Sequence, residues 1–452
     1  MDLSSDKAQQ ATRVVRELRE HGFSAYLAGG CVRDLVLGRE PTDYDVATSA
    51  TPDEVMRIFP RTYAVGAQFG VVLVPVLRDG PQGERANYAI EVATFRSDGL
   101  YSDGRHPDQV RFSSDARLDV QRRDFTINGL LLDPLTQEVL DYVGGRRDLE
   151  LGIIRAIGDP YQRFSEDKLR MLRAVRFAAR FGYQIEKQTL DAVRELAAKI
   201  HQVSHERIRD EVLKMLTEGR ARRAFELLDE TGLLEQVLPE VKKMQGVEQP
   251  PQFHPEGDVW VHTLMLLEGL PAGCSRTLAL GVLLHDVGKP PTFRRAPDRI
   301  RFDQHDEVGT KMAEGICRRF RLSNEETDQV CALVANHMRF GAVARMKEST
   351  LKRFFRLPQF EEHLELHRLD CLSSHRDLSL YDFAKEKFQT MPAGQIRPAP
   401  LITGNDLIAA GYKPGPRFKE LLTAVEDAQL ERTITTKEEA LGLVKSMAQK
   451  SG

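Results

Sequence analysis

The part of the sequence that decides the fold is Leu27-Ala28-Gly29-Gly30-Cys31-Val32-Arg33-Asp34, which is followed closely by Thr42-Asp43-Tyr44-Asp45-Val46. Side chains alternate between the two faces of a strand, so Asp43 and Asp45 are predicted to point the same way. Adjacent carboxylates repel each other, and a divalent cation relieves that repulsion, with hard oxygen ligands favouring magnesium. The pair therefore predicts a Mg²⁺ site that can activate a hydroxyl and stabilise a leaving pyrophosphate.

The residues before this pair suit a triphosphate. Gly29 and Gly30 lack side chains, so backbone amides can approach a phosphate closely. Arg33 adds a planar guanidinium whose geometry matches phosphate oxygens. An ordinary turn and a solvated strand end would explain either element alone, but their combination between two predicted strands favours a nucleotide site.

Outward from this stretch, the chain changes from mixed α/β to helical. A helix is predicted over 9–21 and strands over 24–28, 71–77 and 89–95, whereas the polar segment 96–111 is predicted to be a loop. From about residue 160 the spacing of apolar residues predicts helices over 166–181, 188–200, 205–216 and 221–228.

Prolines mark two further boundaries. The segment 246–257 contains Pro250, Pro251 and Pro255 and is predicted to be a linker, and 391–400 holds three more prolines. A helical block lies between them, and a helical tail follows. A chain of 452 residues suits several domains, and the predicted division is 1–150, 151–245, 246–390 and 391–452.

The composition is that of a globular protein without a membrane span. Hydrophobic residues make up 41% and charged residues 29%, and no apolar run reaches the length of about eighteen residues that a span requires. A net charge of −3 neither requires nor excludes nucleic acid, because a local basic surface is enough. The polar segment 1–10 lacks the apolar core of a signal peptide, so a cytoplasmic location is expected.

The glycine turn followed by Asp43-Tyr44-Asp45 resembles the catalytic motif of polymerase-β superfamily nucleotidyltransferases. That resemblance implies an α/β head with a mixed sheet and a third carboxylate from a later strand. Ile90-Glu91-Val92 has the apolar-acidic-apolar pattern of that strand, so Glu91 is the candidate. A glutamate on an exposed strand face is the equally ordinary alternative.

Between about residues 20 and 240, the chain resembles the bacterial class II tRNA nucleotidyltransferase and poly(A) polymerase family. Besides the glycine turn and the paired aspartates, the motifs that carry this resemblance are Arg122-Arg123-Asp124-Phe125-Thr126-Ile127-Asn128, Asp141 with Gly145, Arg147, Asp148 and Leu149, Glu166-Asp167-Lys168-Leu169-Arg170, and Glu206-Arg207-Ile208-Arg209-Asp210-Glu211. The resemblance implies ribose and phosphate recognition by Arg123 and Asp124, and an all-α neck after the head.

Base selection without a template is implied for the motif that begins at Glu166. An aspartate accepts hydrogen bonds and an arginine donates them, so together they can pair with the edge of cytosine or adenine. In the family the Asp and first Arg of this motif do so, which correspond to Asp167 and Arg170. Arg173 and Arg176 correspond to further nucleotide-contacting arginines and are expected to face the triphosphate. A charged helix face with internal salt bridges is the ordinary alternative.

The implied reaction transfers CMP and AMP from CTP and ATP to the 3′ end of tRNA with Mg²⁺ and releases pyrophosphate. Addition of A alone and poly(A) synthesis stay open, because the same chemistry gives those products. The polar loop 96–111, with Ser97-Asp98-Gly99 and Asp103-Gly104-Arg105, matches the family's flexible loop, which argues against an enzyme restricted to adding C. The oligomeric state is not predicted.

A second constellation lies in the predicted third domain. His262 precedes His285-Asp286, which ends an apolar helix, and His305, His337 and Asp370 follow at wide spacing. This pattern resembles an HD domain, which implies divalent metal binding by His262, His285, Asp286 and Asp370, with His305 and His337 as further candidates.

Imidazole with carboxylate suits Mn, Ni, Fe or Zn better than Mg, and a metal-bound hydroxide can hydrolyse phosphoesters. An HD fold can also survive as an RNA-binding scaffold. The alternative for the whole chain is therefore an RNA-binding HD phosphohydrolase whose head is inactive.

Overall fold

A computed structural model describes residues 1–63, 70–78, 85–99, 109–252 and 254–449. The chain divides into two compact units, Met1–Pro239 and Glu240–Gly452. Across the described residues, no helix combines the length and the apolar character that crossing a membrane requires.

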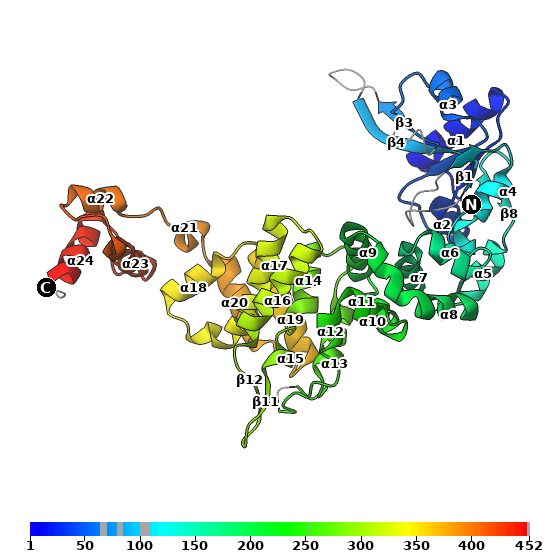
Figure 1. Cartoon of the computed structure of the whole chain (residues 1–452). Coiled ribbons are helices and arrows are strands. Elements are labelled where there is room, and N and C mark those ends of the chain that lie inside the picture. The colour runs from blue at the N-terminus through cyan, green and yellow to red at the C-terminus, as the bar shows by residue number, and fades with distance from the viewer. Residues whose placement is uncertain (64–69, 79–84, 100–108, 253, 450–452) are drawn as a thin grey trace. The chain divides into compact units, whose positions relative to one another are not determined.

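Unit 1 opens with a six-stranded mixed sheet in the order β3-β4-β2-β1-β7-β8. Figure 1 labels β1, β3, β4 and β8 of this sheet. Strands β2 and β4 pair in parallel, whereas the other neighbours pair antiparallel. The strands are β1 (Ala25–Ala28), β2 (Asp45–Thr48), β3 (Val71–Arg78), β4 (Arg85–Thr94), β7 (Leu130–Asp133) and β8 (Glu138–Asp141). The prediction of an α/β head with a mixed sheet is confirmed.

Short helices accompany this sheet and complete what we call the head. Helix α1 starts where the Ser5 side chain accepts an N–H from Ala8, and it buries Val14, Val15 and Leu18. It packs on β1 and β2, so its apolar stripe covers these two strands, the second of which begins at Asp45. The helices are α1 (Asp6–Glu20), α2 (Gly30–Val36), α3 (Pro52–Ile58), α4 (Ala116–Gln121), the 3₁₀ turn η2 (Thr126–Asn128) and α5 (Gly145–Leu151).

The segment 96–111 was predicted to be a loop, and this was wrong at its ends. Its first and last described residues pair as the antiparallel strands β5 (Arg96–Asp98) and β6 (Val110–Phe112). The pairing comes from backbone groups, which a polar sequence does not reveal. The stretch Asp103-Gly104-Arg105 lies outside the described residues.

Helices follow the head within unit 1, and we call them the neck. They are α6 (Pro160–Glu166), α7 (Leu169–Phe181), α8 (Lys187–Leu196), the 3₁₀ helix η3 (Ala197–Gln202), α9 (His205–Thr217), α10 (Ala221–Glu230) and α11 (Leu233–Val237), with a two-residue ladder between β9 (Ile153–Ile154) and β10 (Gln184–Ile185). The helix predicted over 166–181 is confirmed as α7 from Leu169 onward, but its first residue, Glu166, is the end of a separate helix, α6. Asp167 has an extended backbone, and its carboxylate accepts the N–H of Leu169, so it separates α6 from α7.

Unit 2 is helical, as predicted, apart from a hairpin of β11 (Phe293–Arg295) and β12 (Ile300–Phe302) that the sequence did not indicate. Phe340, Phe354 and Phe360 lie in one of its cores, and the tail has a separate core around Leu407. The helices are α12 (Pro239–Lys242, at the boundary in sequence), α13 (Val259–Gly269), α14 (Arg276–Leu284), α15 (Lys289–Thr292), α16 (His305–Arg319), α17 (Asn324–Asn336), η4 (His337–Arg345), α18 (Glu348–Phe355), α19 (Phe360–Ser373), α20 (Ser379–Thr390), α21 (Ala393–Ile396), α22 (Gly404–Ala409), α23 (Pro416–Leu430) and α24 (Lys437–Gln449).

Candidate active site and candidate metal centre

Three carboxylates share one face of the head sheet. Asp45 opens β2, and the exposure alternates before it, because Asp43 and Asp45 are exposed while Tyr44 is buried. Glu91 is the Cα partner of Asp45 in the parallel pairing of β2 with β4 and is also exposed. Residues paired in this way point to the same face. The structure therefore brings Asp43, Asp45 and Glu91 together.

Negative charges on neighbouring carboxylates affect the pKa of Asp45. Loss of surrounding water, together with the negative charges of Glu91 and Asp43, raises the pKa of Asp45 to about 6, although the positive charge of Arg123 opposes the shift. Loss of water also raises the pKa of Glu91. Carboxylates that resist ionisation in one another's presence are suited to a divalent cation.

The glycine turn lies beside Arg123. Gly29 has φ of 74° and ψ of −130°, a conformation that only glycine adopts readily, and it caps the start of α2. A Cβ on Gly29 would lie 3.0 Å from Nη1 of Arg123, so the missing side chain leaves room for that guanidinium. Arg123 is held in place by Asp119 through a 3.0 Å ion pair.

Arg33 does not lie where a phosphate contact would require it. Its guanidinium is buried, donates to Asn128 Oδ1 at 2.6 Å, and stacks near the rings of Phe177 and Phe181. It also forms a 2.8 Å ion pair with Asp34. Arg33 therefore ties α2 to the neck helix α7 from inside the protein, and this buried position does not agree with its predicted role as a phosphate ligand.

The second motif meets the neck through a partly buried ion pair. Arg173 on α7 donates to Asp124 Oδ2 at 2.6 Å, and the amide of Asn128 donates to the other carboxylate oxygen. Burial disfavours the charge on Asp124, but Arg173 and Asn128 outweigh it and lower its pKa to about 2. The head and the neck helix α7 are thus joined at two residues that the sequence assigned to nucleotide binding.

The remaining neck residues that were predicted to contact the nucleotide have different partners and different exposure. Asp167, between α6 and α7, pairs with Arg207 of α9 at 2.8 Å, and Arg170 pairs with Glu166 at 2.7 Å. Both keep part of their surface in solvent.

Arg176 is 5% exposed and is clamped by Glu211 of α9 at 2.6 Å. It cannot face a triphosphate from that position, so this expectation was wrong. Its partner lies in the last of the family motifs, which therefore braces the neck.

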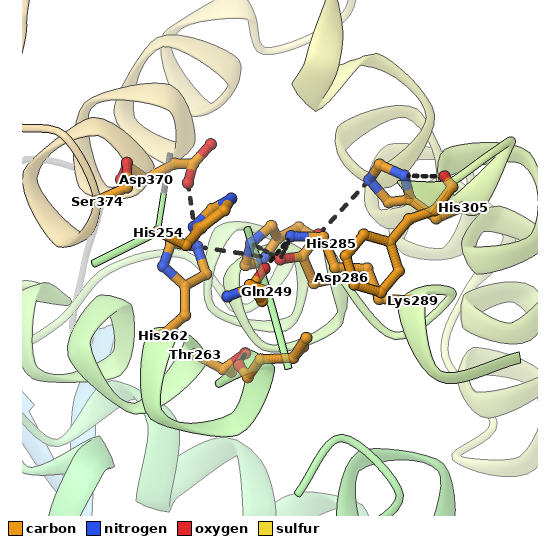
Figure 2. A network of polar contacts seen from close by, with 12 residues as sticks. Gln249, His254, His262, Thr263, His285, Asp286, Lys289, His305, Asp370 and Ser374 are labelled. Atoms are coloured by element: carbon orange, nitrogen blue, oxygen red, sulfur yellow. Dashed lines mark hydrogen bonds and ion pairs between the residues drawn. The ribbon is translucent and has the colours of Figure 1, made fainter. Parts of the chain in front are cut away.

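In unit 2 the predicted histidines and aspartates converge on one centre, and all of them except Asp370 are buried. Figure 2 labels each of these residues except His337. His262 comes from α13, His285 and Asp286 follow α14, and Asp370 comes from α19. His305 starts α16, and His337 follows α17. Nε2 of His262 lies 3.1 Å from Asp370, and Nε2 of His285 lies 3.2 Å from Asp286.

In all four imidazoles the Nδ1 atom has a partner outside the centre. Nδ1 of His285, His305 and His337 each lies within 2.9 Å of the backbone carbonyl three residues earlier, so it must be the donor. Nδ1 of His262 instead contacts Glu256 Oε1 at 2.7 Å. In each ring Nε2 is left to face the centre, which is how second-shell partners present histidines to a metal.

Other residues at this centre were not anticipated. Lys289 Nζ forms a 2.7 Å ion pair with Asp286. The spacing of three residues between them could have indicated this ion pair from the sequence. His254 and Glu256 belong to the segment predicted to be a linker, and Glu256 contacts His254 at 2.9 Å. No local pattern distinguishes them, because the contacts arise only when the proline-rich segment folds over α13.

Charge is balanced inside this centre. Burial disfavours the charge on His262, but Asp370 and Glu256 outweigh it and raise its pKa to about 9. Asp286 and Asp370 have pKa values well below the ordinary range, because nearby histidines, and Lys289 beside Asp286, outweigh the effect of burial. A cavity of about 690 Å³ opens beside the cluster and is lined by residues that include His305, His337 and Asp370.

A mixed sheet that presents three carboxylates beside a glycine turn defines the head as polymerase-β-like. Residues 25–155 match the model described as "Poly A polymerase head domain", 182–245 match "Probable RNA and SrmB- binding site of polymerase A", and 306–444 match a tRNA nucleotidyltransferase domain 2 model.

Similar proteins agree with these matches. A CCA-adding enzyme of Geobacillus sp. is 43% identical over 225 residues, but this match spans 50% of the chain and only 53% of that relative. The CCA-adding enzyme of Enterococcus faecalis is 33% identical over 96% of the chain and 94% of its own length. The crystal structure of the Bacillus stearothermophilus CCA-adding enzyme in complex with CTP superposes with a TM-score of 0.75 at 26% identity, covering 99% of both chains. The chain belongs to the CCA-adding enzyme family.

Proposed function

We propose that the chain adds C and A residues to the 3′ end of tRNA without a template, using CTP and ATP and releasing pyrophosphate. The observation that carries the proposal is the shared face of Asp43, Asp45 and Glu91 beside the glycine turn. Full-length similarity to a CCA-adding enzyme supports the choice of substrates. A tRNA substrate also fits the expected cytoplasmic location.

The carboxylates fit magnesium, because loss of water and the negative charges of Glu91 and Asp43 raise the pKa of Asp45, and a divalent cation would relieve the repulsion between these charges. Asp43 and Asp45 would hold the ion, with Glu91 as the third carboxylate. When bound, Mg²⁺ would supply positive charge at the attacking and leaving oxygens. The Gly29 turn would let the triphosphate approach the backbone, and Arg123 would orient it from beside the turn.

Base selection is assigned to Asp167 and Arg170. Arg207 holds the acceptor Asp167 in a fixed position before a base arrives. Glu166 holds the donor Arg170 in the same way. Asp124 and Arg173 would support the ribose and phosphates as a joined pair. Arg33 and Arg176 are positioning residues in this proposal, because both are buried and hold α7 in place.

The decisive experiment is sequencing of the 3′ ends made from tRNA that lacks its terminal CCA, with CTP and ATP supplied together and separately. Ends completed as CCA support the proposal. Addition of a single A would indicate an A-adding enzyme, and long A tails would indicate a poly(A) polymerase. No incorporation by a folded protein would favour an inactive head.

We also infer a metal-dependent phosphoester hydrolase activity for unit 2, as the resemblance to an HD domain implies. The observation in its favour is the set of histidines whose Nε2 atoms face two carboxylates next to an open cavity. Imidazole and carboxylate ligands suit Mn, Ni, Fe or Zn. Lys289 at the cavity would hold an anionic phosphate oxygen.

A further inference from the structure

Arg163, in the last turn of α6, forms hydrogen bonds in three directions. Its Nε donates to the carbonyl of Ile157 at 3.1 Å, and its Nη2 donates to the carbonyl of Gln121 at 2.8 Å. Its Nη1 donates to Glu166 Oε2 at 2.9 Å, and the side chain is only 12% exposed. Because a guanidinium is planar and its N–H groups point in fixed directions, Arg163 sets the relative positions of these three acceptors.

One carboxylate oxygen links Arg163 to the arginine that we assign to base selection. Oε2 of Glu166 also accepts from Nη1 of Arg170, at 2.7 Å. The same Nη1 donates to the carbonyl of Arg163 at 3.0 Å. These two acceptors use both hydrogens of Nη1, so Arg163 and Glu166 together fix one side of the Arg170 guanidinium.

The two arginines also hold consecutive carbonyls of the head. Gln121 ends α4, and its carbonyl accepts from Arg163. The carbonyl of the next residue, Arg122, accepts from Nη2 of Arg170 at 3.2 Å. Arg123, which lies beside the glycine turn, follows directly in the chain. The orientation of the two neck arginines therefore acts on the backbone that carries Arg123.

We propose that Arg163 is a positioning residue that couples base selection at Arg170 to the placement of Arg123. The inference deepens the proposed addition of nucleotides and rests on it. Arg163 acts through Glu166 and through the carbonyl of Gln121, and it is not assigned a contact with the nucleotide.

This coupling makes base selection affect the rate of transfer as well as the affinity for the nucleotide. N3 of cytosine accepts a hydrogen bond from an arginine, whereas N3 of uracil carries a hydrogen of its own. Cytosine therefore keeps the Arg170 guanidinium in the orientation that supports the carbonyl of Arg122. With uracil the guanidinium turns, and the backbone before Arg123 loses this support. We expect the preference for CTP over UTP to appear in kcat as well as in KM.

The test compares addition of CTP and of UTP to tRNA lacking its 3′ end by the full-length parent and by Arg163→Lys. Lysine keeps the charge, but its donors share one nitrogen and cannot reach three separate acceptors. The ratio of kcat/KM for CTP to kcat/KM for UTP should fall by about 10- to 100-fold, partly through a lower kcat for CTP. Glu166→Gln, which removes the charge between the two arginines, should lower the ratio by a similar factor. The double variant should lower it no further, because both changes act through Arg170.

The matched control is Arg19→Lys. Arg19 also donates to a carbonyl, that of Ala25, and to a carboxylate, that of Asp133, and both partners lie in the head. This variant should keep the ratio of the parent, and a fall equal to that of Arg163→Lys would show that the ratio follows stability alone, which overturns the inference.

An unchanged ratio in Arg163→Lys and Glu166→Gln also overturns the coupling, while CCA addition by the parent leaves the proposed function intact. No addition by the folded parent contradicts the proposed function instead. Urea unfolding of each variant identifies loss of the fold, and Glu166→Gln decides the matter if Arg163→Lys does not fold.

Discussion

Gly29 is constrained in two ways at once. Its positive φ excludes ordinary side chains, and a Cβ would press on Arg123. Gly38 shares only the first constraint, because its φ is 68° but nothing lies within 4 Å of a Cβ there. The two glycines therefore separate backbone strain from displacement of Arg123.

We predict that Gly29→Ala and Gly38→Ala each lower the free energy of unfolding by about 1–3 kcal/mol, the usual cost of such backbone strain. Only Gly29→Ala should also reduce kcat/KM for CTP incorporation, by about 10- to 100-fold, because it displaces a charged contact. Urea unfolding and steady-state incorporation measure the two effects. Equal activity in both variants would show that Arg123 does not act at the turn.

Single residues also show what the sequence can reveal. Alternation along a strand was enough to predict that Asp43 and Asp45 share a face. The position of Glu91 depended on the parallel register of β2 with β4, which no local pattern fixes. Arg33 was misjudged because its partner Asn128 is 95 residues away, and an arginine looks the same in sequence whether it is buried or exposed.

Between elements, the Arg176–Glu211 pair links α7 to α9. Both residues are buried, so removal of one charge leaves the other charge buried without a partner of opposite sign. The sequence placed both in polar motifs but could not show that they face each other, because helical spacing gives a face and not a partner. The break at Asp167 was also hidden, since aspartate is tolerated within helices.

We predict that Arg176→Ala lowers the free energy of unfolding by about 3–5 kcal/mol, as expected when a buried ion pair is broken from one side. The double variant Arg176→Met with Glu211→Met should recover much of this loss. The control is Arg194→Ala, whose exposed partner Glu230 makes a loss of only about 0–1 kcal/mol expected. Urea midpoints measure all three, and an unchanged midpoint for Arg176→Ala would contradict the bracing role.

At the scale of the molecule, each compact unit contains its own group of candidate metal ligands. Unit 1 contains the carboxylates of the head, and unit 2 contains the cluster of histidines and aspartates. The sequence predicted the mixed sheet, the helical remainder and the convergence of the six metal-centre residues. It missed the hairpin β11–β12 and the part that His254 and Glu256 play, because both depend on long-range packing. The finer division near residues 150, 245 and 390 stays a prediction.

We predict that His285→Ala with Asp286→Ala leaves nucleotide addition intact, because these residues lie in unit 2 and the carboxylates of the head lie in unit 1. The same variant should lose phosphoester hydrolysis and bound transition metal. Addition to tRNA and hydrolysis of a model phosphodiester are measured side by side. Loss of addition with an intact fold would mean that unit 2 serves the tRNA.

The account depends most on the carboxylates of the head, and Asp45→Asn tests it most directly. Asparagine removes the charge with little change in shape, and the raised pKa of Asp45 means that its charge does not stabilise the fold. The control is Glu138→Gln, an exposed carboxylate on β8.

The measurement is single-turnover incorporation of CTP into tRNA lacking its 3′ end, with tRNA binding recorded on the same samples. We predict that Asp45→Asn slows incorporation by about a thousandfold or more, equivalent to about 4 kcal/mol or more, while tRNA binding and the unfolding midpoint are retained. Incorporation at the rate of Glu138→Gln would contradict the assignment of nucleotidyl transfer to this site.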